Sequence, residues 1–120
     1  AEPLTPTLGS ASIIGAIGGV IVVFGVPFLD KLKIDDVVGA IPVHLFAGIW
    51  GTIAVVFTNS DASLSTQLYS IVVVGLFTFI ASAIIWYVLK SISGIRVSEE
   101  DEITGLDISE LGMPAYDIIK

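Results

Sequence analysis

Three uncharged, largely apolar runs constrain this chain more than any other feature. They cover residues 8–29, 37–58 and 62–89 of the 120. A helix rises about 1.5 Å per residue, so about 20 apolar residues cross the roughly 30 Å hydrocarbon layer of a bilayer. Only 14% of the residues are charged, against roughly a quarter in soluble domains. We therefore expect an all-α membrane protein with three transmembrane helices, at about 8–29, 37–58 and 65–90.

The charges are unevenly distributed along the chain. The formal net charge is −7, and most carboxylates follow the third run. Residues 1–93 therefore form the predicted membrane domain, and residues 94–120 form a short acidic tail. With five basic residues in all, nucleic acid is not an expected partner. The chain contains no cysteine, so it offers no disulfide framework and leaves the redox compartment undetermined.

Basic residues indicate the orientation of the three runs. Lys31 and Lys33 lie between the first and second runs, and Lys90 and Arg96 follow the third. The link at residues 59–61 has no basic residue. Loops rich in lysine and arginine remain on the cytoplasmic side of membranes. We therefore expect the N-terminus outside and the C-terminus in the cytoplasm.

His44 is the one histidine of the chain and lies within the second run. An ionisable side chain at membrane depth is costly, so a role in transport or proton handling is the favoured interpretation. A purely structural, hydrogen-bonded histidine is the alternative. A metal site is not expected, because the runs offer no second histidine, no cysteine and no carboxylate.

Helical spacing predicts the surroundings of His44. Residues three, four and seven positions apart share a face, which gives the imidazole small neighbours: Ala40, Ala47 or Gly48, and Gly51. The other surface, with Val43, Phe46, Trp50, Ile53 and Phe57, is expected to face lipid or other helices.

Three further features bear on the first and second runs. Asp35 and Asp36 precede the second run, where carboxylates cap a helix N-terminus, and a role in an inner vestibule is the alternative. Pro27 is expected to end or mildly kink the first helix. Gly15 and Gly19 form a GxxxG pair, which indicates ordinary helix packing more than a specific dimer motif.

The segment around His44 also carries a recognisable pattern. It reads Asp35-Asp36-Val37-Val38-Gly39-Ala40-Ile41-Pro42-Val43-His44, and then Ala47-Gly48-Ile49-Trp50-Gly51-Thr52. This pattern resembles the penultimate membrane helix of the ammonium transporter family (Amt/Mep/Rh). The resemblance extends to residues 15–19 and 29–34 and to the tail, whereas the third run matches only in character.

The resemblance implies an eleven-helix ammonium transporter fold, of which this chain would supply the last three helices and the cytoplasmic tail. The protein would be a homotrimer that passes ammonium or ammonia through an apolar pore in the cell membrane, with no enzymatic activity and no cofactor. His44 would be the second of two pore histidines. The first histidine and the outer cation site would belong to an upstream part of the same protein. An ammonium sensor with little flux, built on the same fold, is the alternative.

The tail contains two patterns typical of short helices. Ser98-Glu99-Glu100-Asp101 resembles a capping box that Gly105 can end, and Asp107-Ile108-Ser109-Glu110 repeats the pattern before Gly112. Taken alone, such an acidic segment is typical of a solvated face. The resemblance implies a regulatory tail that contacts a PII-type (GlnK-like) protein. The candidate regulatory residues are Gly94, Arg96, Glu99, Glu100, Asp101, Gly105 and Asp107.

The distal tail departs from the family pattern. Relatives often carry His-Gly-Glu where this chain has Leu111-Gly112-Met113, and Pro114 follows. The beginning of the chain does not read as a signal peptide, because no positive charge precedes the first run. We therefore expect the chain to be the C-terminal part of a longer protein.

Overall fold

The computed structural model describes residue 2 and residues 4–115, and its regular elements there are all helical. In chain order they are α1 (Leu8–Lys31), the π-helix η1 (Ile41–Phe46), α2 (Ala47–Ala54), the 3₁₀ turn η2 (Val55–Phe57), α3 (Leu64–Ile92), α4 (Glu99–Thr104) and α5 (Leu106–Leu111). The expected all-α class is therefore confirmed.

Two of the helices, α1 and α3, are long and apolar enough to cross a membrane. The second expected span is shorter, because η1, α2 and η2 follow one another over residues 41–57. We refer to these three elements together as the composite helix. It begins four residues later than the apolar run, because residues 37–39 form a turn. At 1.5 Å per residue it is about 26 Å long, somewhat short of the hydrocarbon layer.

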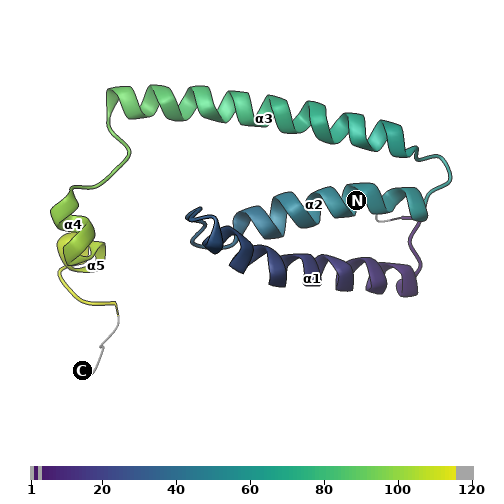
Figure 1. Ribbon diagram of the computed structural model, residues 1–120, viewed down its shortest axis with the longest axis horizontal. Coiled ribbons are helices and arrows are strands. Elements are labelled where there is room, and N and C mark those ends of the chain that lie inside the picture. Colours follow the sequence, from purple (N-terminus) through teal and green to yellow (C-terminus); the bar gives the residue numbers. More distant parts are fainter. Residues whose placement is uncertain (1, 3, 116–120) are drawn as a thin grey trace. The chain divides into compact units, whose positions relative to one another are not determined.

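The chain forms two units, residues 1–78 and 79–120. In the first unit, α1 and the composite helix lie side by side and run in opposite directions (Figure 1). Leu29 on α1 and Ala54 on the composite helix are the buried apolar residues of this contact, together with Pro42. This pair of helices carries the residues around His44.

Local signals explain both ends of α1. The Thr7 side chain accepts a hydrogen bond from the Ser10 N–H (3.2 Å) at the N-terminus. At the other end, the N–H groups of Lys33 and Ile34 donate to carbonyls of the last turn, with Lys33 in the left-handed region (φ 58°). This pairing is a Schellman motif, usually made with glycine. Pro27 lies inside the helix, so the expectation that it ends α1 is wrong.

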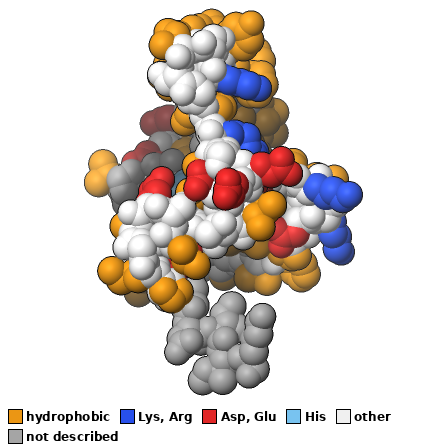
Figure 2. All heavy atoms as spheres, turned by 90° about the vertical axis from the view of Figure 1, so that its left-hand side faces the viewer, with side chains coloured by type: hydrophobic (Ala, Val, Ile, Leu, Met, Phe, Trp, Pro, Cys, Tyr) orange, Lys and Arg blue, Asp and Glu red, His pale blue; other side chains and the backbone are white. Residues whose placement is uncertain are grey.

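Helix α3 contrasts with the composite helix in its surroundings. It is α-helical over 29 residues and buries none of them. Trp86 and Tyr87, near its end, are exposed. Exposed apolar side chains are common across the described residues, and many are visible in orange in Figure 2. An isolated helix that is apolar on all sides is typical of one that lipid or other membrane helices surround.

Candidate functional site

The composite helix begins on the carboxylate of Asp36. One carboxylate oxygen (Oδ1) accepts from the Ala40 N–H (2.8 Å), and the other (Oδ2) accepts from the Ile41 N–H (2.7 Å). Pro42 has no N–H to satisfy, and the Val43 N–H donates to the Gly39 carbonyl (3.0 Å). The N–H groups of Ala40, Ile41 and Val43 at the start of the helix therefore all have partners.

Only one of the two neighbouring carboxylates makes these contacts. Asp36 is half-buried under the helix start, whereas Asp35 is exposed. Gly39 lies between the carboxylate and the helix with φ +69°, a conformation that a residue with a side chain rarely adopts. The turn at residues 37–39 thus allows Asp36 to reach the N–H groups four and five residues ahead.

His44 lies in the middle of the π-helix. The bond that defines this turn runs from the Ala47 N–H to the Pro42 carbonyl, five residues back. Pro42 lies in the first turn, where its missing N–H costs no intrahelical hydrogen bond. Single π turns inside α-helices are rare and occur frequently at functional sites. The histidine that the sequence analysis singled out is therefore on the irregular part of its helix.

The side of the composite helix that contacts α1 is well defined. A Cβ built on Gly25 would lie 2.9 Å from Pro42 Cβ and 3.2 Å from Phe46 Cδ2, so the two helices approach closely at this glycine. Further along, the Trp50 indole N–H (Nε1) donates to the Ile14 carbonyl (2.9 Å). Pro42, Phe46 and Trp50 thus face α1, so part of the surface expected to face lipid or other helices lies in a helix contact.

The His44 side chain is exposed on a different side of the helix from these contacts. Val43, Leu45 and Gly48 are exposed as well, and nothing lies within 4 Å of a Cβ built on Gly48. Ala47, in contrast, contacts α1 at Gly18. Of the two alternatives offered for the face of His44, Gly48 is exposed like the imidazole, whereas Ala47 lies toward α1.

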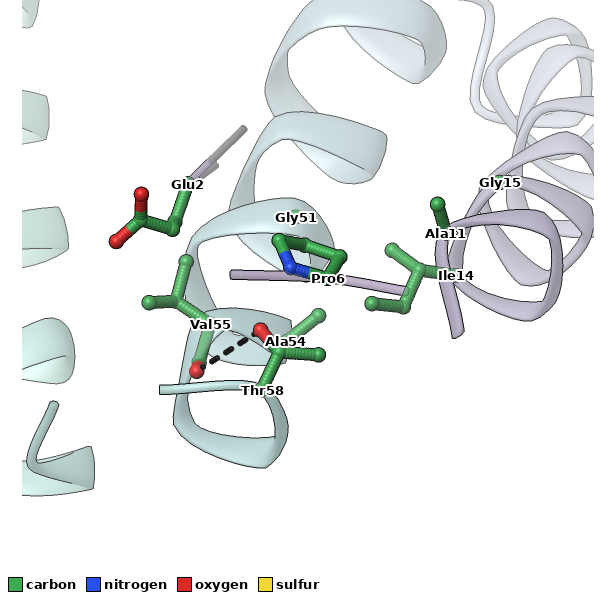
Figure 3. A pocket seen from close by; sticks show the side chains of 9 residues that line it. All are labelled: Glu2, Pro6, Ala11, Ile14, Gly15, Gly51, Ala54, Val55 and Thr58. Carbon is green, nitrogen blue, oxygen red and sulfur yellow. Dashed lines mark hydrogen bonds between the residues drawn. The ribbon is translucent and has the colours of Figure 1, made fainter. Parts of the chain in front are cut away.

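A cavity of about 290 Å³ lies elsewhere in the first unit, between the N-terminal segment, α1 and the end of the composite helix (Figure 3). Small and apolar residues line most of it, including Ala11, Ile14, Gly15, Gly51 and Ala54. Its polar groups are the Glu2 carboxylate, which accepts from Asn59 Nδ2 (2.9 Å), and the Thr58 hydroxyl, which donates to the Val55 carbonyl (3.3 Å). His44 does not line this cavity. No sequence motif indicated it, because it arises from segments far apart in the chain.

The tail residues lie in the second unit, on and around two short helices. Ser98 caps α4, accepting from the Asp101 N–H (3.1 Å) while its hydroxyl donates to the Asp101 carboxylate (2.6 Å). Gly105, with φ +100°, follows the last residue of α4. The first capping pattern of the tail is therefore confirmed.

The second capping pattern is wrong. Helix α5 begins at Leu106, so Asp107 lies inside its first turn and accepts instead from the Ala115 N–H (2.6 Å). Gly112 ends α5 in the left-handed region, as the sequence indicated.

The other tail candidates lie at the surface. Gly94 has φ +71°, and Arg96 pairs with Glu102 (2.9 Å). Glu99 and Glu100 occupy the exposed first turn of α4. An exposed pair such as Arg96 and Glu102 contributes only about 0 to 1 kcal/mol. The segment is thus an exposed acidic surface on which Ser98 caps α4.

A metal centre has no support in the part of the chain that the structure describes. Residues 2 and 4–115 contain no group of three or more histidine, cysteine, aspartate or glutamate side chains placed to hold an ion. The chemistry available at the composite helix is therefore that of an imidazole, with one donor and one acceptor when neutral, beside apolar side chains.

Two long apolar helices with largely exposed side chains are typical of an α-helical membrane protein. The particular family follows from comparison with known proteins. The Ammonium Transporter Family model matches residues 5–116. The chain belongs to this family.

Individual relatives give the same result. A Synechocystis protein named for ammonium transport is 44% identical over 105 residues, which cover 86% of this chain and 24% of the relative. Ammonium transporter Amt2 of Archaeoglobus fulgidus is 38% identical over 127 residues (89% and 27%). Ammonium transporter Amt1 of Haloferax mediterranei is 40% identical over 109 residues (87% and 21%). The chain thus spans about a quarter of the length of these relatives.

Proposed function

We propose that this chain is the C-terminal part of an ammonium transporter, with ammonium or ammonia as its substrate and His44 as one of a pair of pore histidines. The observation that carries the proposal is the placement of the imidazole. In a chain that belongs to this family, His44 is exposed on a side of the composite helix that α1 does not contact. That side is free for helices from the upstream part of the protein.

The chemistry of an imidazole suits this role. A cation loses its hydration in an apolar passage, and that cost excludes ammonium while the neutral ammonia passes more readily. A neutral imidazole offers one N–H donor and one acceptor nitrogen. Paired with a second histidine, His44 would accept the proton that ammonium releases and pass it along the pair while ammonia moves beside the rings. The second histidine would come from an upstream helix.

The arrangement in the membrane is part of the proposal. The N-terminus of the chain would lie outside the cell, and residues 94–120 would form a cytoplasmic tail, in accordance with the distribution of lysine and arginine. Asp36 would act as a helix cap, supported by its two hydrogen bonds to the Ala40 and Ile41 N–H groups, and Asp35 would face the inner vestibule. The assembled transporter would be a homotrimer.

The acidic tail would carry regulation. Its exposed carboxylates and capped turns offer a surface for a PII-type (GlnK-like) protein, and Gly94, Arg96, Glu99, Glu100, Asp101, Gly105 and Asp107 would form or shape that surface. The support is its exposure together with family membership. A binding assay between the full-length transporter and such a protein tests this part separately from transport.

The test of transport is the ammonium-evoked current of the full-length protein in proteoliposomes. We expect His44→Ala to abolish the current or change its ion selectivity at equal protein content. His44→Gln, which keeps a donor and an acceptor but cannot exchange protons at neutral pH, should also lose the proton-coupled current. Leu45→Ala is the matched control, because it shortens an exposed side chain on the same turn.

Each remaining outcome contradicts part of the proposal. An unchanged current in His44→Ala would make His44 a packing residue. A wild-type protein that binds ammonium but carries no current would favour the sensor. If Leu45→Ala lost the current to the same extent, the loss in His44→Ala would reflect a disturbed turn and not the missing imidazole.

A further inference from the structure

The position of His44 is set by the backbone of its turn, since the imidazole is exposed in the described structure. Pro42 and Phe46 lie two residues before and two residues after it, and both contact α1 at Gly25. Residues two apart on a helix do not face each other. The contact at Gly25 therefore directs the imidazole away from α1.

Gly25 permits this contact because it has no side chain. An added Cβ would lie 2.9 Å from Pro42 Cβ and 3.2 Å from Phe46 Cδ2, closer than packed atoms normally allow. Pro42 is fully buried and its ring cannot change rotamer as a flexible chain would. Any side chain at position 25 must therefore move the backbone turn that carries His44.

A second attachment lies further along the same side. The Trp50 indole N–H donates to the Ile14 carbonyl (2.9 Å), and Gly18 allows the ring to lie against α1, with a Cβ there 3.8 Å from Trp50 Cδ1. Pro42, Phe46 and Trp50 follow one another at intervals of four positions, and all three contact α1. The two attachments together fix both the height and the rotation of the composite helix against α1.

We propose that Gly25 and Trp50 are positioning residues for His44, an inference that rests on the transport role proposed for this histidine. Neither residue reaches the imidazole. Both residues hold the opposite side of the composite helix against α1. The His44 imidazole thereby keeps a fixed position relative to the second histidine proposed on another helix. Proton transfer requires hydrogen-bond distance, and a displacement of about 1 Å can reduce a rate by up to a hundredfold.

The decisive variant is Trp50→Phe in the full-length protein, which keeps an aromatic ring and removes only the N–H donor. We expect the maximal ammonium current in proteoliposomes to fall about tenfold with little change in the half-saturating concentration. Trp86→Phe is the matched control, because this exposed indole lies on α3. A residue with a merely structural role would reduce the amount of folded protein but not the current per molecule.

A double variant tests whether Trp50 acts through His44. Where His44→Ala retains a current of altered ion selectivity, the addition of Trp50→Phe should leave that current unchanged, because the two effects are not additive for residues that work as a unit. Equal reductions in both backgrounds would overturn the inference, and so would an unchanged current in Trp50→Phe alone. If His44→Ala itself leaves the current intact, the proposed function fails, whatever Trp50→Phe does.

Gly25→Ala provides an independent test if the tryptophan variant does not fold. We expect it to lower the maximal current, whereas Gly19→Ala, on the same helix, should not. Nothing lies within 4 Å of a Cβ built on Gly19. Equal currents in the two glycine variants would overturn the positioning role of Gly25.

Discussion

The composite helix and α3 are both apolar segments of one chain, yet they differ in regularity. Helix α3 stays α-helical over 29 residues and buries none of them. The composite helix changes from π to α to 3₁₀ geometry, and it includes the buried Pro42 and Ala54. A helix whose neighbour is lipid needs only hydrophobicity and intact backbone bonds. A helix that holds one residue at a set position needs particular contacts with its neighbours. Departures from regular helix geometry are expected where function requires them.

The two helices also differ in length. Helix α3 is about 44 Å long at 1.5 Å per residue, whereas the composite helix is about 26 Å long. A span longer than the hydrocarbon layer tilts or emerges from it, and a shorter one depends on its neighbours or thins the bilayer. The comparison therefore predicts that equal substitutions will have unequal effects on the two helices.

The largest difference is expected for glycine-to-leucine substitutions. Gly25→Leu should destabilise the protein by about 3 kcal/mol, because the side chain overpacks the contact with Pro42 and Phe46. Gly75→Leu on α3 should cost little, since nothing lies within 4 Å of its Cβ position. The measurement is the thermal unfolding midpoint of the full-length protein in detergent. Equal shifts would remove the distinction between the two helices.

Phenylalanine truncation tests the same contrast from the opposite direction. Phe46→Ala should cost about 2 kcal/mol through lost packing, less than in a soluble core because lipid is itself apolar. Phe77→Ala should stay within about 0.5 kcal/mol, since Phe77 is 74% exposed on α3. Thermal unfolding again gives the answer, and a larger effect at Phe77 would place a protein neighbour against α3.

The cap of the composite helix predicts a smaller effect. Asp36→Ala removes the acceptor of two backbone N–H groups and should cost about 1 kcal/mol. Asp35→Ala is the control, because its exposed carboxylate does not cap the helix in this way, and we expect no measurable change. Amide exchange at Ala40 and Ile41 reports the loss directly. Unchanged protection of these two amides in Asp36→Ala would contradict the cap.

The smallest effect is expected in the connection between α1 and the composite helix. Lys33→Gly should stabilise the protein by about 0.5 kcal/mol, because glycine adopts the left-handed conformation without strain but costs more entropy on folding. Lys31→Gly removes the same charge from the last turn of α1 and should destabilise it instead. Shifts of the same sign for both variants would show that charge, and not backbone conformation, decides the outcome.

The sequence predicted those features that depend on residues close together in the chain. The helical class and the two long spans follow from uncharged runs, and the Ser98 cap follows from a four-residue pattern. Membership of the ammonium transporter family follows from the spacing around His44. The function of His44 and of the tail stays a prediction, because the chain spans about a quarter of the length of its relatives.

The features that the sequence did not predict depend on contacts or on irregular backbone geometry. The π turn has no clear pattern beyond Pro42, so helical spacing left open whether Ala47 or Gly48 shares the side of His44. The Asp36 carboxylate reaches N–H groups four and five residues ahead because the chain turns at Gly39. The hydrogen bonds, and not the sequence, show that Asp36 is the cap. The contact between Trp50 and Ile14 spans 36 positions, beyond the reach of any local pattern.

The irregular start of the composite helix has a consequence for how the protein enters the membrane. Helix α3 is hydrophobic enough to be recognised and inserted as a single segment. The composite helix is short and carries His44 and a helix-disfavouring proline, so it partitions into lipid less readily by itself. Helix α1 is synthesised first and already carries Gly25, against which Pro42 packs. It can therefore serve as an insertion partner within the same chain, and a side chain at Gly25 should reduce the yield of membrane-inserted protein in addition to the current that each inserted molecule carries.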